Sequence, residues 1–198
     1  MIISKILNKI TGLIFKLYSI LINWLIFSVE GVDYSRFPKV AGRINVLNRG
    51  KIALGKQNIL TSSNKSNPVG GGSNTSIYCS PGGNIKIDDN VAISNSVIFS
   101  QKSIHIKSGA MIGGGCQIYD TDFHSLKWKE RLKIEDEKIK TAPVIIEENA
   151  FLGCNVIVLK GSVIGKNSII GAGSVVKGKI PENEIWGGNP AKYIKSIT

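Results

Sequence analysis

The sequence predicts an all-β solenoid of short extended segments joined by tight corners. The main observation is a six-residue repeat that runs without interruption over residues 146–181. Each repeat opens on an aliphatic side chain and places a small or aliphatic side chain four residues later. The opening residues are Ile146, Leu152, Val158, Ile164, Ile170 and Val176. Self-similarity at a fixed short period is typical of repeat architectures, in which stacked coils bury a shared core.

The period of six favours strands over a helix. Six residues rotate by roughly 240° around an α-helix, which would scatter the aliphatic side chains around its axis. On a strand every even step returns to the same face, so the first and fifth positions of each repeat both point inward. Glycine and asparagine stand between these positions, as at Gly153, Asn155 and Gly161, where a tight corner needs unusual backbone angles.

The length, net charge and cysteine content limit the class of protein and the kinds of partner it can have. A chain of 198 residues is expected to form one domain with room for an extra segment. Its net charge of +11 indicates an anionic partner, and the absence of a nucleic-acid motif favours a membrane surface over nucleic acid. The three cysteines, Cys79, Cys116 and Cys154, have neither disulfide nor metal-ligand spacing. We expect free thiols that pack as small residues, which suits a reducing cytoplasm.

Residues 1–30 are predicted to form an amphipathic helix. Polar residues recur at steps of three and four and define a narrow stripe: Lys5, Asn8, Lys9, Gly12, Lys16, Ser19 and Asn23. The uncharged run after Lys16 is interpreted as too short to cross a bilayer, and no signal-peptide cleavage site follows it. The prediction is a helix lying in the membrane interface, apolar side down, with its lysines among the headgroups. The alternative is a helix packed against the body or a neighbouring subunit.

A basic segment follows this helix. Residues 36–65 contain seven bases and no acid: Arg36, Lys39, Arg43, Arg49, Lys51, Lys56 and Lys65. Basic residues beside an amphipathic helix add attraction to anionic lipid, at about 1 kcal/mol per side chain near the surface. The segment could also be a solvated face, or could receive an anionic acceptor such as a nucleotide-sugar or a lipid-linked saccharide.

The solenoid is predicted over residues 31–181, with irregularities. Weak frames at Leu54 and Leu60 precede a Gly-, Ser- and Asn-rich loop over residues 64–84. The later frames open on Ile87, Ile93 and Phe99, then slip by one residue near Ser100–Ser103 and continue at Ile106, Ile112 and Ile118. An insertion over residues 119–143 interrupts the repeat. Residues 182–198 leave the period and form a tail, predicted to contain a short helix from Pro190 onward.

The insertion carries the chemistry that the repeat lacks. Asp120, Asp122 and His124 occupy alternate positions, which share a face in an extended chain. A carboxylate beside an imidazole fixes its tautomer and stabilises the imidazolium that forms when it accepts a proton. His124 is therefore a candidate general base for a hydroxyl or an amine. Asp-x-Asp-x-His is a weak pattern by itself, and a histidine on a surface loop is the simpler interpretation.

A larger pattern supports the catalytic interpretation. The motifs DTDFHSL, TAPVII, the perfect hexapeptides, GAGSVV and GGNPAK occur in that order over about residues 85–195. In this the chain resembles the hexapeptide-repeat O-acetyltransferases of the maltose/galactoside and capsule/lipopolysaccharide type. The resemblance implies a left-handed parallel β-helix shaped as a triangular prism, a homotrimer with active sites between prisms, acetyl-CoA as donor and direct transfer without an acyl-enzyme. It also identifies His124 with the catalytic histidine, although HSL stands where relatives often have His-Pro-Leu.

The resemblance also implies donor contacts. Cys154 and Ala172 match positions that contact CoA, and their small side chains leave room for the pantetheine arm. Lys177 and Lys195 match basic positions near the nucleotide, although Gly178 follows where relatives have a lysine after a threonine. These lysines could equally be an exposed, solvated edge.

Two residues are candidates for the acceptor, and one histidine is not. Trp128 could stack on a sugar ring or pin the insertion to a neighbouring subunit, and Asn95 could bind an acceptor hydroxyl. His105, between Ile104 and Ile106, is interpreted as exposed and inert.

Competing functions are weaker. A γ-class carbonic anhydrase shares the prism but needs three histidines per zinc, and the chain has two, so we predict no metal. A structural solenoid scaffold needs no loop histidine. The predicted function is O-acetylation of a sugar hydroxyl on a surface polysaccharide or its precursor, in the bacterial cytoplasm and peripheral to the inner face of its membrane. The alternatives are N-acetylation of an amino sugar and acetylation of a xenobiotic.

Overall fold

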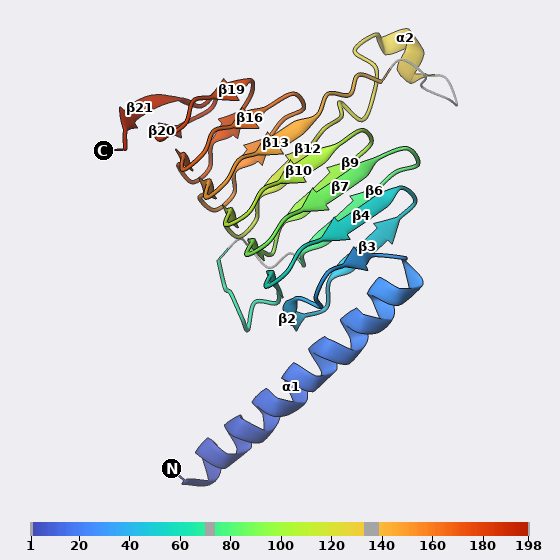
Figure 1. Cartoon of the computed structure of the whole chain (residues 1–198), viewed down its shortest axis with the longest axis vertical. Coiled ribbons are helices and arrows are strands. Elements are labelled where there is room, and N and C mark those ends of the chain that lie inside the picture. The colour runs from blue at the N-terminus through green and yellow to red at the C-terminus, as the bar shows by residue number, and fades with distance from the viewer. Residues whose placement is uncertain (1, 70–73, 133–138, 198) are drawn as a thin grey trace.

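The structure, a computed structural model, describes residues 2–69, 74–132 and 139–197. A left-handed parallel β-helix stands on a long N-terminal helix, α1 (Ile2–Val29), and three sheets form the sides of the prism (Figure 1). The chain visits the sheets in turn, so each stacks one strand per coil. Sheet A contains β1 (Asp33–Tyr34), β4 (Lys51–Leu54), β7 (Asn84–Ile87), β10 (Ile104–Ile106), β13 (Val144–Ile146), β16 (Val163–Ile164) and β19 (Lys179–Ile180).

The other two sheets follow the same stacking rule. Sheet B contains β2 (Lys39–Gly42), β5 (Ile59–Ser62), β8 (Ala92–Ser94), β11 (Met111–Ile112), β14 (Phe151–Leu152), β17 (Ile169–Ile170), β20 (Glu184–Gly187) and β21 (Lys192–Ser196). Sheet C contains β3 (Asn45–Asn48), β6 (Ser76–Cys79), β9 (Val97–Ser100), β12 (Gln117–Tyr119), β15 (Ile157–Val158) and β18 (Val175–Val176).

The six-residue repeat builds the core as predicted. All six opening aliphatics of residues 146–181 are fully buried, and so are the residues four places later, except Ile180, which is 4% exposed. Asn149, Asn155 and Asn167 take positive φ angles of 56–58° at the corners between strands. A corner needs this left-handed backbone, and asparagine tolerates it better than most side chains.

The predicted frame at Phe99 is wrong. The inward residue of β9 is Ile98, which is fully buried and lies in register with Ile118 of the next coil. The step from Ile93 to Ile98 is five residues and the step from Ile98 to Ile106 is eight, so the frame shortens by one residue before β9 and the wider corner at residues 100–103 lengthens it by two. Phe99 therefore faces outward, where its ring centroid lies 4.9 Å from that of Phe123.

Two further predictions need correction. The loop predicted over residues 64–84 contains strand β6, whose Ile77 and Cys79 enter the core; residues 70–73 lie outside the described part. The short helix predicted from Pro190 is instead strand β21, which pairs antiparallel with β20. This hairpin covers the last coil, and Trp186 and Tyr193 pack edge to face at 6.4 Å. In each case an available sheet edge outweighed local composition.

Helix α1 closes the other end of the prism with its polar side. Ser19 and Asn23 are fully buried, and Gly42 N donates to Ser19 Oγ at 2.9 Å. Asn23 Nδ2 donates to Gly42 O at 2.8 Å, and Ile44 N donates to Asn23 Oδ1 at 2.9 Å. These side chains satisfy backbone groups that the first coil would otherwise leave unpaired. Part of the polar stripe predicted to face lipid headgroups therefore faces the prism.

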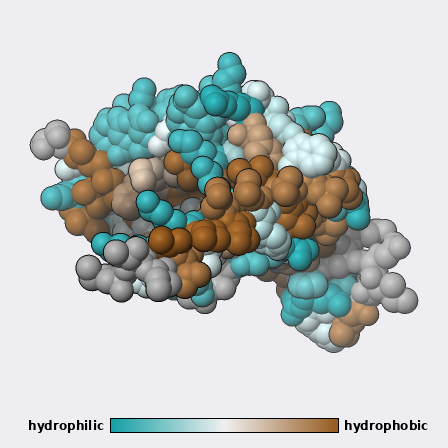
Figure 2. Space-filling model, turned by 90° about the horizontal axis from the view of Figure 1, so that it is seen from below, coloured by the Kyte–Doolittle hydropathy of each residue, from teal (hydrophilic) through white to brown (hydrophobic). Residues whose placement is uncertain are grey.

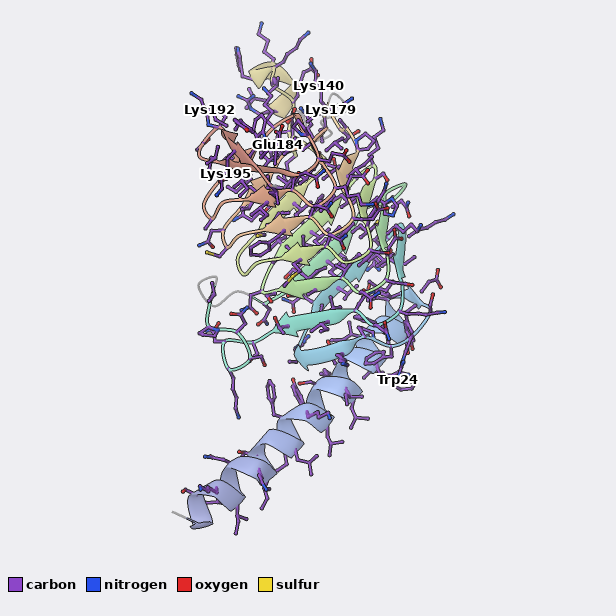
Figure 3. The ribbon with its side chains drawn as sticks, turned by 60° about the vertical axis from the view of Figure 1, so that its left-hand side comes forward. Trp24, Lys140, Lys179, Glu184, Lys192 and Lys195 are labelled. Atoms are coloured by element: carbon purple, nitrogen blue, oxygen red, sulfur yellow. The ribbon has the colours of Figure 1, made fainter. Side chains whose placement is uncertain are left out.

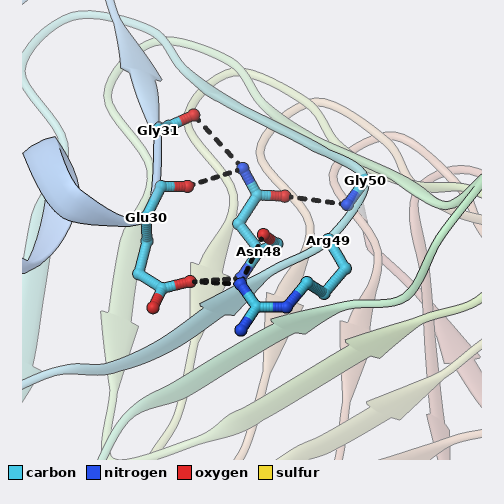
Figure 4. Close-up of polar contacts among 5 residues, drawn as sticks. All are labelled: Glu30, Gly31, Asn48, Arg49 and Gly50. Carbon is cyan, nitrogen blue, oxygen red and sulfur yellow. Dashed lines mark hydrogen bonds and ion pairs between the residues drawn. The ribbon is translucent and has the colours of Figure 1, made fainter.

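The end of α1 is tied to sheet C by a second polar cluster (Figure 4). Glu30 Oε2 accepts from Asn48 N at 2.8 Å and lies 3.6 Å from Arg49 Nη1. Asn48 Nδ2 donates to the backbone oxygens of Glu30 and Gly31. The last turn of the helix and the first coil therefore form one rigid joint.

Helix α1 matches the helix predicted over residues 1–30 and contains one long apolar stretch. Residues Ser4–Val29 are long and apolar enough to cross a membrane by length and composition. This stretch includes Lys5, Lys9 and Lys16, whereas the sequence interpretation concerned the shorter, uncharged run after Lys16. The contacts of Ser19 and Asn23 with the prism restrict how much of the helix could enter a membrane.

Candidate functional site

The long excursion leaves the prism between β12 and β13, and short backbone contacts close its base. Asp122 N donates to Lys140 O at 3.0 Å, and Ala142 N donates to Asp120 O at 2.9 Å. A short helix, α2 (Trp128–Arg131), lies in the outer part, and residues 133–138 lie outside the described residues. The excursion projects from one corner of the prism (Figure 1). Its first residues are thereby fixed to a rigid coil.

Asp120 does not orient the histidine, contrary to one of the predicted roles. Its carboxylate is fully buried against the corner at residues 100–103 of the neighbouring coil. Oδ2 accepts from Ser100 Oγ at 2.7 Å, Lys102 N at 2.8 Å and Ser103 N at 2.7 Å, and Oδ1 accepts from Gln101 N at 2.8 Å. Asp120 is therefore the anchor that holds the widened corner.

His124 is exposed at the base of the excursion, directly after a residue with unusual backbone geometry. Phe123 has a φ of 62°, and its ring packs on Phe99 at 4.9 Å and on Tyr119 at 5.0 Å. A positive φ is uncommon for a bulky residue and persists only where its surroundings hold it. It also breaks the extended alternation, so Asp120, Asp122 and His124 do not share one face as predicted.

Asp122 makes an ion pair that the sequence prediction missed. Its Oδ1 lies 3.2 Å from Lys160 Nζ, and both side chains are about one-quarter exposed. Lys160 stands in the corner after β15, and β15 is the strand directly beside β12 in sheet C. The sequence contained one signal for this pair. The insertion follows β12, so the corner after the strand stacked on β12, which contains Lys160, must lie beside the base of the insertion. Asp122 and Lys160 therefore lie at the same corner of the prism, between sheets C and A.

The predicted donor residues divide between two edges of sheet C. Cys154 and Ala172 lie in stacked corners between sheets B and C, where Gly173 N donates to Cys154 O at 2.8 Å. Lys177 is exposed in the opposite corner, between β18 and β19, near the edge that carries Asp122. One chain therefore does not bring these residues around a single point.

The predicted C-terminal lysine lies on the final hairpin. Lys195 is exposed on β21, beside Lys192 at the end of the prism opposite to α1 (Figure 3).

The acceptor candidates have different environments. Asn95 is fully buried; its Oδ1 accepts from Ser63 N at 3.0 Å and its Nδ2 donates to Asn67 O at 2.7 Å. It anchors the loop after β5, so the predicted contact with an acceptor is wrong. Trp128 is 61% exposed on α2, and Lys129 Nζ lies 5.6 Å from its ring centroid. Leu126 and Leu132 beside it are exposed as well.

His105 is not inert, contrary to the sequence interpretation. Its Nε2 lies 2.8 Å from Asp88 Oδ2, and Lys86 Nζ lies 3.1 Å from Asp88 Oδ1. Burial raises the pKa of Asp88, but the hydrogen bonds from His105 and Lys86 outweigh it, and the net pKa is lowered. This cluster stabilises the outer surface of sheet A.

The cysteines are free, with Cys79 and Cys116 buried and Cys154 partly exposed. Burial raises the pKa of the Cys116 thiol to about 11, so it stays protonated at neutral pH. Among residues 2–69, 74–132 and 139–197, no group of three His, Cys, Asp or Glu side chains could hold a metal ion.

Comparison with known proteins identifies the repeat. The profile of the family described as bacterial transferase hexapeptide (six repeats) matches residues 143–178. The chain is 35% identical over 119 residues to the putative lipopolysaccharide biosynthesis O-acetyl transferase WbbJ of Escherichia coli, covering 57% of this chain and 61% of that protein. It is 40% identical over 122 residues to a putative acetyltransferase of Saccharomyces cerevisiae, covering 61% and 60%. The chain therefore spans about 60% of the length of these relatives.

Solved structures agree with the fold. A hexapeptide-repeat acetyltransferase from Vibrio cholerae is 31% identical, with a TM-score of 0.53 over 58% of this chain and 63% of that one. A second structure of that protein contains acetyl-CoA. An N-acyltransferase from Bacillus cereus superposes over 89% of this chain and 88% of that one with a TM-score of 0.68; at 19% identity it supports the fold alone. The predicted resemblance to hexapeptide-repeat acetyltransferases is confirmed.

Proposed function

We propose that this chain, which carries the transferase hexapeptide repeat, is an acetyl-CoA-dependent O-acetyltransferase that acts on a sugar hydroxyl of a surface polysaccharide or its precursor. The position of His124 carries the proposal. It is an exposed imidazole held at the base of the long excursion by the packed Phe123 and by the ladder to Lys140. An imidazole exchanges protons near neutral pH, as a general base for a hydroxyl requires.

The proposed reaction is a direct transfer. His124 accepts the proton of the acceptor hydroxyl while the hydroxyl oxygen attacks the thioester carbonyl of acetyl-CoA. The carbon–sulfur bond then breaks, the acetyl group stays on the acceptor oxygen, and the CoA thiolate takes the proton from the imidazolium. Holding both substrates in one cleft supplies much of the rate enhancement, because it removes the entropy cost of bringing them together.

Asp122 is proposed as the carboxylate that orients His124. Its ion pair with Lys160 fixes the position of its carboxylate on the neighbouring coil. As an anion two residues from His124 in the chain, Asp122 would favour the protonated imidazole that appears during transfer. Lys160 is thereby a positioning residue, which acts through Asp122.

The donor residues support a site shared between copies of the chain. Because Cys154 and Ala172 lie at the edge of sheet C opposite to Asp122, a complete site needs two prisms side by side. Apolar side chains on the outer face of sheet B are available for such packing: Ile59, Met111 and Phe151 are each at least 40% exposed. We propose a homotrimer in which the corners at Cys154 and Ala172 hold the pantetheine arm and Lys177 and Lys195 attract the CoA phosphates.

The acceptor is proposed to contact the excursion. Trp128 presents an exposed ring that could stack on a sugar. A Staphylococcus aureus protein that is 27% identical over 97 residues is named as an N-acetyltransferase, so an amine, such as that of an amino sugar, is the second candidate acceptor.

The test is transfer by the purified full chain. Acetyl-CoA is supplied with sugars that carry only hydroxyls or with amino sugars, and free CoA thiol and the acetylated product are measured. We expect O-acetyl product, with His124→Ala reducing kcat/KM by about 10²–10⁴-fold. His105→Ala, which removes the other histidine, is the matched control. Product from amino sugars alone would favour N-transfer, and full activity of His124→Ala would reject the site. No transfer to any acceptor would favour a scaffold.

A further inference from the structure

Helix α1 is amphipathic, but it turns polar side chains toward the protein and apolar side chains outward, whereas a helix that covers a protein core does the reverse. The C-terminal part of its polar stripe contacts the prism, because Ser19 and Asn23 hydrogen-bond to the backbone of Gly42 and Ile44. Among the apolar residues of α1 from Ile6 to Val29, only Phe27 is fully buried, against Tyr34 and Phe37. The apolar face therefore remains on the outside.

This outer face is extensive. Its side chains are 50–75% exposed: Ile6, Leu7, Ile10, Leu13, Ile14, Leu17, Leu21, Trp24, Leu25 and Val29. Seen from below, a band of hydrophobic residues crosses this end of the molecule with hydrophilic residues on both sides (Figure 2), and Trp24 projects away from the prism (Figure 3). A contiguous apolar surface bordered by polar residues marks a site of interaction with a protein or a membrane.

Charge distinguishes between these partners. The exposed bases of residues 36–65 belong to the coils beside α1. Lys65 Nζ lies 5.4 Å from the ring centroid of Phe15, Lys39 opens the strand β2 next to α1, and Arg43 lines a cavity of about 440 Å³ together with Leu25 and Val29. The acid at this joint, Glu30, already binds Asn48 N and Arg49. An apolar face with a basic border complements anionic lipid, whereas a second copy would bring like charges together.

The contacts of α1 also favour a helix that lies in the interface over one that spans. Ser19, Asn23 and Phe27 are held against the prism, which leaves residues 2–18 to enter a bilayer. They rise about 25 Å, less than the roughly 30 Å of the hydrocarbon core. They also carry Lys5, Lys9 and Lys16, and a lysine is costly at the bilayer centre. We propose that α1 lies in the interface of an anionic membrane, apolar face down, with the prism standing above it. The proposal is independent of acetyl transfer.

The experiment is flotation of the purified full chain with vesicles of phosphatidylcholine, alone or mixed with phosphatidylglycerol. We expect binding to the mixed vesicles that weakens as salt is added, because exposed charges are screened. The double substitution Ile14→Asn with Leu21→Asn, in the exposed apolar face, should abolish binding. The double substitution Lys39→Gln with Lys65→Gln should weaken it by up to roughly 30-fold, since each lysine near an anionic surface contributes about fivefold.

Matched controls keep the test decisive. Lys102→Gln with Lys179→Gln removes two exposed lysines on coils further from α1 and should bind as wild type does. Unchanged circular dichroism and melting temperature show that each variant is folded. The proposal is overturned if Ile14→Asn with Leu21→Asn binds as wild type does, or if both lysine pairs weaken binding equally. It is also overturned if the apolar variant changes the oligomeric mass in solution, because a second copy would then cover the face.

Discussion

Replacing Asp120 tests whether this carboxylate is an anchor or part of the catalytic machinery. It accepts hydrogen bonds from Ser100 Oγ and from the backbone N–H groups of residues 101–103, at 2.7–2.8 Å. In Asp120→Ala the three N–H groups can recover water, at a net loss of about 1 kcal/mol each. The buried Ser100 hydroxyl keeps the Asn84 oxygen at 3.3 Å as an acceptor, so losing its bond to Asp120 costs about 1 kcal/mol more. We therefore expect the free energy of unfolding to fall by about 4 kcal/mol.

The assay is urea unfolding followed by circular dichroism, with all variants at one protein concentration because an oligomer's stability depends on it. Asp120→Asn keeps one acceptor oxygen but turns an amide group toward N–H donors, so it should lose about half as much. Asp33→Ala, at an exposed strand position, is the control and should stay within about 0.5 kcal/mol of wild type. The reasoning is refuted if Asp120→Asn keeps full stability and instead changes the pH dependence of acetyl transfer. That result would restore Asp120 as the residue that orients His124.

Three further predictions follow from named contacts. Asp122→Asn should reduce kcat with little change in KM and should alter the pH–rate profile, while the melting temperature falls only slightly because Asp122 pairs with Lys160 near the surface; an unchanged profile would exclude an orienting role. His105→Ala should raise the pH midpoint of acid unfolding. The lowered pKa of Asp88 stabilises the fold above the ordinary carboxyl range, and this contribution is lost as pH falls through the lowered value, so removing His105 moves the loss to higher pH; an unshifted midpoint would contradict this. In native protein a maleimide should label Cys154 first, with Cys79 and Cys116 reacting only after unfolding, because burial raises both of their pKa values; CoA should protect Cys154 if the proposed donor corner is right, and labelling unaffected by CoA would argue against it.

The fold could be predicted because the repeat is redundant. Each coil repeats the same pattern of inward positions, so an error in assigning one six-residue frame does not change the assignment of the other frames. The error in the frame occurred where one side of a coil departs from six residues. At β9 two apolar neighbours, Ile98 and Phe99, both fit the pattern, and the five-residue step that selects Ile98 depends on Asn95 with its φ of 43°. Local composition gives no information about that step.

The site was predicted less completely, since its residues are joined by the stacking of coils. The identity of His124 came from motif order, whereas the Asp122–Lys160 pair depends on which corner lies above which. Asp120 was misassigned because alternation assumes an extended chain, and Phe123 leaves that conformation. In sequence, a buried carboxylate that binds the backbone of a corner cannot be told from an exposed carboxylate that orients a histidine. The hydrogen-bond donors around each carboxylate, which only the structure shows, distinguish the two roles.

The two proposals together restrict the acceptor. If α1 lies on the membrane, β3 is the first strand of sheet C above it, and the order β3, β6, β9, β12 sets the site three strand spacings higher. At about 4.8 Å per spacing, the base of the excursion stands roughly 15 Å above the first coil. A lipid headgroup would not reach that height, but a saccharide of several units attached to a lipid would. Acetylation of lipid-linked saccharides on vesicles should therefore increase as the saccharide lengthens. An enzyme that accepts a lipid-linked monosaccharide equally well would show that the prism does not stand upright on α1.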